Sequence, residues 1–545
     1  AQCSYLQTLI FIMCVTTSPR YYMAVDSSRS WRGVSNLAII LLIWEVIGRL
    51  DLVAGGALPG ISEIVLRLWQ DWGDYPRHIG ATLYASIAGF IIGNFFGIAA
   101  GVLFAMSPTA LKLFRGVNIA AFALPPIAIA PILVLTLSGM APRIALAALG
   151  VYFVTMTATV IGLSQADSRT TDLIRAYGGT RWDILRRVQF RGAMPSILSG
   201  LRVAAPNAVL GSILAEFGGG GRWGLGAYLL GSLGRGEPDR LWGIGLVATL
   251  IAALSYGAFA IIAARIIGST RAVTINTAIP DSIQTNDQPV KRITLMMGTV
   301  ALPFLVWWAF IKLTGVPDLI AKTPWGVFDY LFLSQTSTNA QQRLLAALAE
   351  TLPITFIGMA AGLVFAFLLA ISSRLFPRAI EAFMPVALVT QTMPLVALTP
   401  LLVLILGRGS SLTLWVTISV TFFPAFVTLA QGLALVPRSA EDLPRAYGAT
   451  RWTEMRLVTI PASLPYIFAA TRLTVPRALL GVMIAEWLAT GKGLGNLLNQ
   501  SRGFLDFGMI WTVAAVSVLL SVIFYQAVVV VERRVLRRLG MATAE

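Results

Sequence analysis

The sequence predicts an all-α integral membrane protein with about twelve transmembrane helices, arranged as two parallel-repeat halves of six helices each. The 545 residues are 57% hydrophobic and only 12% charged, whereas soluble chains average about 25% charged residues. Apolar stretches long enough to cross about 30 Å of hydrocarbon recur along the whole chain. The two halves also share residues at a near-constant offset. The composition excludes a soluble enzyme and a disordered chain.

Six spans are predicted in each half. The first six lie near residues 37–54, 80–106, 117–138, 143–164, 200–217 and 242–264. The second six lie near residues 294–314, 350–371, 383–406, 411–436, 466–489 and 508–531. The spans 200–217 and 466–489 are the least sharply defined, because Arg202, Arg472 and Arg477 lie near or inside them.

The spans and the polar segments between them predict five parts. They are a cytoplasmic N-terminal segment over 1–36, a first repeat over 37–268, a cytoplasmic linker over 269–293, a second repeat over 294–531 and a basic cytoplasmic tail over 532–545. Residues 1–22 are interpreted as an extension upstream of a natural start, because the stretch from Met23 reads as an ordinary cytoplasmic start.

Rare residues exclude several kinds of chemistry. The two cysteines, Cys3 and Cys14, both precede Met23, and His78 is the single histidine. The sequence therefore offers no zinc-ligand set, no serine–histidine triad and no disulfide framework. We predict neither a catalytic residue nor a metal site.

A tandem duplication relates the two halves. The segment Arg-Ala-Tyr-Gly-Gly-Thr-Arg-Trp at 175–182 matches Arg-Ala-Tyr-Gly-Ala-Thr-Arg-Trp at 445–452, an offset of 270 residues. The same offset relates Glu216 to Glu486, and an offset of 269 relates Pro125 to Pro394. Six spans per half give both repeats the same orientation, so the repeat is parallel. The expected shape is a pseudo-dimer with a pathway between the halves.

The matched segment is the most polar part of each half and lies between the fourth and fifth spans. Its pattern predicts a short helix, a glycine break and a second short amphipathic helix. Gly178 and Gly448 suit a helix end that needs positive φ, and Thr180 and Thr450 suit N-caps. Aromatic side chains beside arginines are typical of a docking surface. A plain basic loop on lipid headgroups explains the arginines but not the duplicated order of residues.

The segment resembles the EAA loop of binding-protein-dependent ABC importer permeases, which reads Glu-Ala-Ala, three residues, Gly, nine residues, Ile-x-Leu-Pro. Asp172 and Asp442 replace the glutamate, and both glycines are kept. The alanines are replaced by Leu-Ile and Leu-Pro. Arg191 replaces the final proline, which the second half keeps as Pro461. The segments after each loop are similar to the nitrate/sulfonate/taurine/bicarbonate branch, and the resemblance covers both halves from about residue 60 onward.

The resemblance implies a fused permease of type I importer (MetI-like) architecture. Each loop would form a coupling helix in a groove of a cytoplasmic ATPase, and ATP would switch the halves between inward-facing and outward-facing forms. The implied partners are two cytoplasmic ABC ATPase subunits, a periplasmic or lipid-anchored solute-binding protein and the lipid bilayer, without nucleic acid or a second permease chain. The coupling residues in loop 1 are Asp172, Arg175, Ala176, Tyr177, Gly178, Thr180, Arg181 and Trp182. Those in loop 2 are Asp442, Arg445, Ala446, Tyr447, Gly448, Thr450, Arg451 and Trp452.

The chain is expected to hold no cofactor of its own. A phosphate-binding loop needs Gly-x-x-x-x-Gly-Lys-Ser/Thr, but the only Gly-Lys pair, Gly491-Lys492, is followed by Gly493. ATP and magnesium are therefore expected on the partner ATPase, and the chain is predicted to be a transport subunit rather than an enzyme.

Ionisable residues are rare inside the predicted spans. They include Glu45, Arg49, Glu216, Lys312, Arg477 and Glu486. Glu216 and Glu486 are pathway or gate candidates, and the alternative is that they hydrogen-bond the backbone of the glycine-rich turns that follow. Pro125 and Pro394 should kink the third spans, either to line the pathway or for packing alone.

Charge predicts the orientation. The segments assigned to the cytoplasm carry +15 of the net charge of +16, as the positive-inside rule requires. The basic excess therefore indicates orientation rather than nucleic-acid binding. We expect a multi-pass protein of the bacterial inner membrane with both termini in the cytoplasm.

Two other transporter types stay open. A fused ferric-iron or thiamine-type permease also carries duplicated loops, although the segments after the loops fit the sulfonate/nitrate branch better. A secondary transporter needs no ATPase and leaves the duplicated docking loop without a role. Only the resemblance to the nitrate/sulfonate/taurine/bicarbonate branch favours a small anion as the solute. A thiamine precursor or another heterocycle also stays open.

Overall fold

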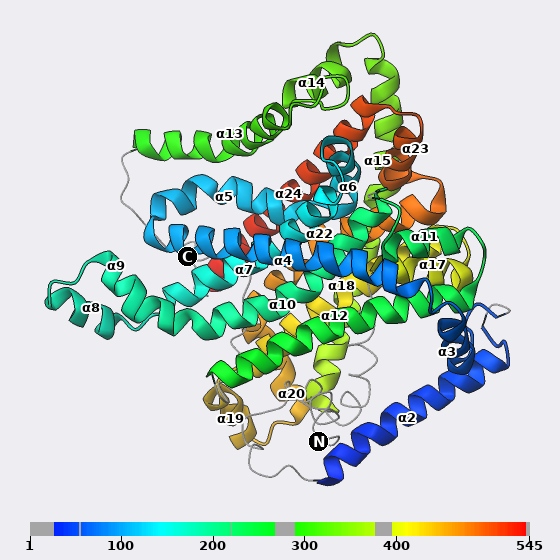
Figure 1. Ribbon diagram of the computed structural model, residues 1–545. Helices are drawn as coiled ribbons and strands as arrows, with labels where there is room; N and C mark the ends of the chain where they lie inside the picture. Colours follow the sequence, from blue (N-terminus) through cyan, green and yellow to red (C-terminus); the bar gives the residue numbers. More distant parts are fainter. Residues whose placement is uncertain (1–26, 54–55, 220, 268–288, 377–394, 541–545) are drawn as a thin grey trace.

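The chain folds into helices, and no strand occurs in the part that the structure describes (Figure 1). The computed structural model describes residues 27–53, 56–219, 221–267, 289–376 and 395–540. The predicted extension over 1–22 and most of the predicted linker over 269–293 lie outside these ranges. The predicted all-α membrane fold with two repeats is confirmed.

The helices of the first half follow the predicted order. They are α2 (Ser27–Arg49), α3 (Ile61–Gln70), α4 (Tyr75–Met106), α5 (Pro108–Ala123), α6 (Pro126–Thr136), α7 (Ala141–Ser164), α8 (Ser168–Ala176), α9 (Arg181–Ile184), the π-helix η1 (Leu185–Gln189), α10 (Phe190–Phe217), α11 (Leu225–Leu233) and α12 (Pro238–Ile267).

The second half repeats this order. Its helices are α13 (Pro289–Thr314), α14 (Pro324–Phe328), η2 (Asp329–Leu333), α15 (Ser337–Leu375), α17 (Leu395–Leu406), α18 (Ser410–Ala434), α19 (Arg438–Ala446), α20 (Arg451–Glu454), η3 (Met455–Thr459), α21 (Ile460–Ala462), α22 (Leu464–Ala485), η4 (Glu486–Thr490), α23 (Gly493–Gly503) and α24 (Phe507–Arg538).

Nine segments of the described chain are long and apolar enough to cross a membrane, and the bent pair α5–α6 makes a tenth. These ten correspond to ten of the twelve predicted spans. The predicted span 37–54 begins within α2, which is not among the ten. The predicted span 383–406 lies partly outside the described residues, and α17 forms its described end.

The predicted third span of the first half is broken rather than straight. Helices α5 and α6 meet at 100°, and Leu124 and Pro125 between them adopt extended conformations with ψ of 117° and 114°. A residue before proline is pushed out of the helical region, and proline itself donates no hydrogen bond. The break predicted at Pro125 is therefore confirmed, whereas Pro394 lies outside the described residues.

Small residues allow close packing inside each half. Helix α4 packs along α7, and α15 packs along α18. A Cβ on Gly93 would lie 2.6 Å from the Ala148 carbonyl oxygen, and one on Gly358 would lie 2.7 Å from Thr417 Cγ2. Both contacts are too short for a larger residue, as expected where membrane helices approach through small residues.

The first helix of the second half packs on the first half. Helix α13 lies along α5 (Figure 1), and the Thr299 hydroxyl donates a hydrogen bond of 2.9 Å to the Lys112 carbonyl. Helix α24 also contacts α5 and α6. The sequence did not predict these contacts, which join the two repeats.

The duplication extends to the first helix of each half. Trp44 Nε1 donates to the Pro59 carbonyl, and Trp307 Nε1 donates to the Lys322 carbonyl, both at 3.1 Å. The tryptophans and their acceptors are each 263 residues apart. The repeat thus begins before α4, with an offset shorter than the one that relates the later helices.

Candidate coupling loops and outer gate

Loop 1 (residues 168–184) forms the predicted helix, glycine break and helix. Helix α8 ends before Gly178, whose φ is +77°, and its N–H donates to the Arg175 carbonyl at 2.9 Å. Thr180 caps α9 by accepting from the Asp183 N–H, while the Asp183 carboxylate accepts from the Thr180 N–H at 3.0 Å. This reciprocal capping box fixes the start of α9.

Loop 2 (residues 438–454) has the same backbone plan. Gly448 has a φ of +78°, and the Thr450 hydroxyl accepts from the Thr453 N–H at 3.3 Å. Thr453 stands where loop 1 has Asp183, so the second cap lacks the reciprocal carboxylate. Both loops therefore have the positive-φ glycine and the threonine cap that the sequence predicted.

Each loop exposes the same two aromatic side chains, a tyrosine and a tryptophan. Tyr177 and Tyr447 are 85% and 86% exposed, and Trp182 and Trp452 are 60% and 55% exposed. The loop acids Asp172 and Asp442 pair at the surface with Arg175 and Arg445. The remaining predicted positions end or begin the loop helices; they are Ala176, Ala446, Arg181 and Arg451. Exposed large aromatic side chains in matched places are typical of a protein-binding surface.

Loop 2 is tied to the helices around it by charges that loop 1 lacks. Arg445 donates two hydrogen bonds of 2.7 Å to the carboxylate of Glu454 in α20. Glu441 in α19 is buried and lies 3.2 Å from Arg374 at the end of α15. Loop 1 has Thr171 and Ile184 at the positions of Glu441 and Glu454. Ion pairs that loop 1 lacks therefore join the two helices of loop 2 to each other and join α19 to α15.

The variant Glu454→Gln should loosen loop 2 alone. The Arg445 side chain loses its bidentate partner, and its backbone becomes easier to open for a protease. Limited trypsin digestion, followed by mass spectrometry of the fragments, should show severalfold faster cleavage after Arg445 and unchanged cleavage in loop 1. The matched control is Asp172→Asn, which removes a solvent-exposed ion pair and should change neither rate. Equal acceleration in both loops would contradict the unequal attachment.

Glu216 and Glu486 bind the glycine turns that follow them. Both carboxylates are buried, at 1% and 3% exposure. Glu216 accepts from the Thr82 hydroxyl at 2.8 Å and from the Gly226 N–H at 2.7 Å. Glu486 accepts from the Thr351 hydroxyl at 2.7 Å and from the Gly495 N–H at 2.9 Å. Both glutamates therefore make the hydrogen bonds to the glycine turns that were the alternative prediction for them. Their role in a pathway or gate stays a prediction.

The two threonines make matching hydrogen bonds in each half. The Thr82 hydroxyl also accepts from the Leu225 N–H at 2.9 Å, and the Thr351 hydroxyl accepts from the Leu494 N–H at 2.8 Å. In the first half, these bonds join α4 to the end of α10 and to the turn before α11. In the second half, they join α15 to the end of α22 and to the turn before α23. The repeated Thr-Leu pair at 82–83 and 351–352 was the sequence signal for these partners.

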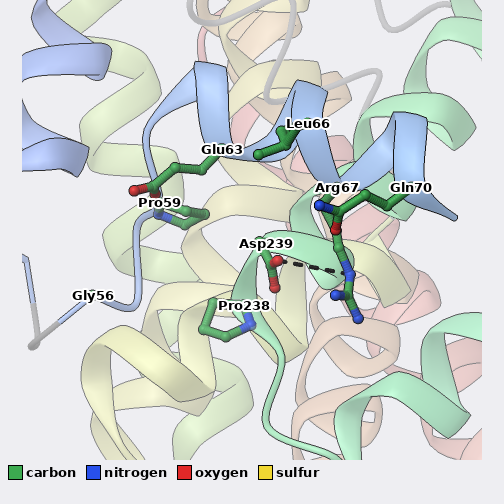
Figure 2. A pocket seen from close by; sticks show the side chains of 8 residues that line it. All are labelled: Gly56, Pro59, Glu63, Leu66, Arg67, Gln70, Pro238 and Asp239. Carbon is green, nitrogen blue, oxygen red and sulfur yellow. Dashed lines mark ion pairs between the residues drawn. The ribbon is translucent and has the colours of Figure 1, made fainter.

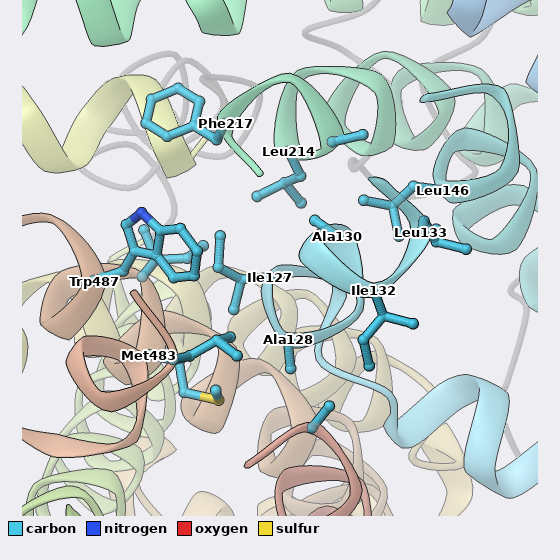
Figure 3. Close-up of a cluster of buried hydrophobic side chains, with 14 of the residues drawn as sticks. Ile127, Ala128, Ala130, Ile132, Leu133, Leu146, Leu214, Phe217, Met483 and Trp487 are labelled. Atoms are coloured by element: carbon cyan, nitrogen blue, oxygen red, sulfur yellow. The ribbon is translucent and has the colours of Figure 1, made fainter. Parts of the chain in front are cut away.

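A buried apolar cluster joins the two halves close to these turns (Figure 3). Ile127 of α6 belongs to the same cluster as Phe217 at the end of α10 and as Met483 and Trp487 of α22 and η4. These four side chains are at most 6% exposed. Sequence patterns do not identify these residues, because hydrophobicity alone does not distinguish a contact between halves from an ordinary core. The cluster packs the two halves together at the end of the molecule that carries the glycine turns.

A pocket lies beside α3 at the start of α12 (Figure 2). Arg67 lies 3.7 Å from Asp239 and 3.1 Å from Glu237. Next to it, Arg240 donates two hydrogen bonds, of 2.6 and 2.8 Å, to Asp71, and these bonds hold the pKa of Asp71 below its ordinary value. Arg67 is therefore paired with acidic side chains, whereas Glu63, which also lines the pocket, accepts a hydrogen bond of 2.9 Å from the Gly60 N–H.

The sequence matches one protein family in both halves. The profile of the family described as "Binding-protein-dependent transport system inner membrane component" covers residues 93–271 and 358–537. Together these ranges are about two thirds of the chain and contain both loops, both buried glutamates and the four cluster residues Ile127, Phe217, Met483 and Trp487.

Individual relatives match about half of the chain. A riboflavin transport system permease protein of Chloroflexus aurantiacus is 28% identical over 239 residues, which are 44% of this chain and 88% of the relative. A formylaminopyrimidine transport permease protein of Halalkalibacterium halodurans is 28% identical over 219 residues, or 39% and 85%. A taurine transport system permease protein of Escherichia coli is 22% identical over 245 residues, or 45% and 89%. Each of these proteins thus corresponds in length to one repeat.

Proposed function

The chain belongs to the family of binding-protein-dependent transport system inner membrane components, and from this membership we propose that it supplies both membrane halves of an ATP-driven importer. It is a tandem-duplicated ABC transporter permease that spans the membrane several times. The proposal adds that one chain does the work of two single-repeat permeases and that a cytoplasmic ATPase drives it through loops 1 and 2.

The observation that carries the proposal is the pair of matched loops. Each loop presents an exposed tyrosine and tryptophan on two short helices. Figure 1 shows α8–α9 and α19–α20 projecting from the helix bundle, away from α11 and α23. A pseudo-symmetric pair of docking surfaces suits a dimeric partner. We assign this partner as two ABC ATPase subunits, each holding one loop.

The closed contact between the halves supports a two-state mechanism. The apolar cluster around Ile127 and Trp487 (Figure 3) seals the end that carries the glycine turns, and the loops project at the other end (Figure 1). In the proposed cycle, ATP brings the loops together and parts this seal, so that a solute released by a binding protein enters from outside. The structure then corresponds to the inward-facing form.

Charge supports the proposed orientation. The loops and the basic segments at the chain ends lie on the cytoplasmic side, because that side collects lysine and arginine in membrane proteins. A protein of the bacterial inner membrane with both termini in the cytoplasm follows. ATP and magnesium are assigned to the ATPase, and the solute-binding protein docks on the opposite side, where α3, α11, α14 and α23 lie.

Co-purification with the ATPase tests this function. The tagged chain is expressed with a candidate ABC ATPase and a candidate binding protein chosen from its genomic neighbourhood, and the complex is reconstituted in proteoliposomes. We expect the ATPase to co-purify and its ATP hydrolysis to rise when the loaded binding protein is added. A chain that carries its solute equally well without ATPase and ATP would instead be a secondary transporter.

A further inference from the structure

Arg477 lies in the middle of a membrane span. It is 13 residues from either end of the span Leu464–Thr490, a distance of about 20 Å along a helix. An arginine side chain cannot bridge that distance to reach the headgroups. A charge at such a depth is costly and normally faces a partner or a water-filled pathway.

The other arginines of the fifth spans have partners. Arg472 lies 3.2 Å from Glu532 of α24, and the Arg202 guanidinium stacks 4.2 Å from the centre of the Tyr256 ring. For Arg477, by contrast, neither an ion pair nor a hydrogen bond is formed with the residues that the structure describes. Its charge is therefore available to a molecule that enters the protein.

Helical spacing places Arg477 on the face of α22 that meets the first half. Leu480, Ile484 and Trp487 follow it at i+3, i+7 and i+10, and all three belong to the cluster that joins the halves. Residues at these spacings lie on one face of a helix. Arg477 therefore lies one turn below the apolar seal, on the side of the coupling loops.

Helix α10 of the first half presents the equivalent face, but with a different residue at the position of Arg477. Asn207 occupies the position equivalent to Arg477, and Leu210, Leu214 and Phe217 continue its face into the same cluster. Both Asn207 and Arg477 are half-buried. One amide and one guanidinium thus stand at matching depths on the two fifth helices, directly below the seal.

We propose that Arg477 and Asn207 form a solute-contact site in the pathway, and that the group bound there is an anion such as a sulfonate or carboxylate. The planar guanidinium can bind such a group through two hydrogen bonds, and the Asn207 amide can donate to it from the other half. This assignment rests on the proposed permease function and adds the chemical class of the solute. The site is asymmetric, because only the second half contributes a charged side chain to it.

Charge-selective cysteine labelling tests the site. Cys3 and Cys14 are first replaced by serine, and Leu473→Cys places a thiol one turn from Arg477, towards the loops. In nanodiscs, we measure its rates with anionic 2-sulfonatoethyl methanethiosulfonate and cationic 2-(trimethylammonium)ethyl methanethiosulfonate. The anionic reagent should be favoured, and Arg477→Gln should lower the ratio of the two rates by about fivefold or more. Arg477→Lys should keep the ratio high.

The first half offers a matched control. Val203→Cys lies one turn from Asn207, as Leu473 does from Arg477, and the added change Asn207→Arg should raise its preference for the anionic reagent. A ratio at Leu473→Cys that Arg477→Gln leaves unchanged would overturn the proposal. So would a thiol that reacts only with a lipid-soluble maleimide, since that would place this face towards lipid. Neither result depends on the ATPase, so the coupling function would be judged separately.

Discussion

Replacing both loop glycines by valine should abolish ATP-driven uptake while leaving the chain folded. Gly178 and Gly448 have φ of +77° and +78°, a region that costs other residues about 1–2 kcal/mol each and β-branched residues most. A Cβ at either position would meet open space, so the cost comes from the backbone alone. The second helix of each loop should shift against the first, and uptake into proteoliposomes should fall by about tenfold or more.

The matched control is Gly178→Asn with Gly448→Asn. Asparagine adopts positive φ more readily than valine, so this variant should keep most of the uptake. Both double variants should elute like the unaltered chain in size-exclusion chromatography, because the loops lie outside the helix bundle. Equal uptake by the valine and asparagine variants would show that the turn conformation is irrelevant to coupling.

Removing the buried carboxylate in the second half should cost stability as well as function. Glu486→Ala leaves the Gly495 N–H and the Thr351 hydroxyl without their acceptor inside the protein. Unsatisfied buried polar groups cost about 1–3 kcal/mol each, so the loss for these two groups should be about 2–6 kcal/mol. Scanning fluorimetry in detergent should show a clear drop in the unfolding temperature.

Two further variants define the cause of that loss. Gly493→Ala should destabilise the chain in the same way, because its Cβ would overlap the Glu486 carboxylate and its φ is +85°. Glu350→Ala removes an exposed carboxylate 3.7 Å from Lys492 and should change stability by less than about 0.5 kcal/mol. Should Glu486→Ala unfold at the same temperature as Glu350→Ala, the hydrogen-bond network would not hold the turn.

The local features of the candidate site could be predicted because they depend on neighbouring residues. A glycine after a short helix and a threonine before the next one determine the backbone of each loop, whatever surrounds it. The duplication strengthened this prediction, since chance does not repeat an eight-residue pattern at a fixed offset. Pro125 likewise marked the break in the third span of the first half.

Contacts between distant segments could not be predicted in this way. Helical periodicity shows that a face is apolar but not what covers it, so the packing of α13 on α5 and the cluster of Ile127 with Trp487 were missed. The pairing of Arg445 with Glu454 depends on how two loop helices fold back on each other. The duplicated Thr-Leu pair was visible in the sequence, but its link to the buried glutamates required the structure.

The mass of the intact complex tests the central claim most directly. Native mass spectrometry of the chain co-purified with its ATPase counts the copies of each subunit. If one chain supplies both halves and both docking loops, the complex should contain one copy of this chain and two ATPase subunits. A complex with two copies of this chain for each ATPase pair, or a chain that binds no ATPase, would contradict the account.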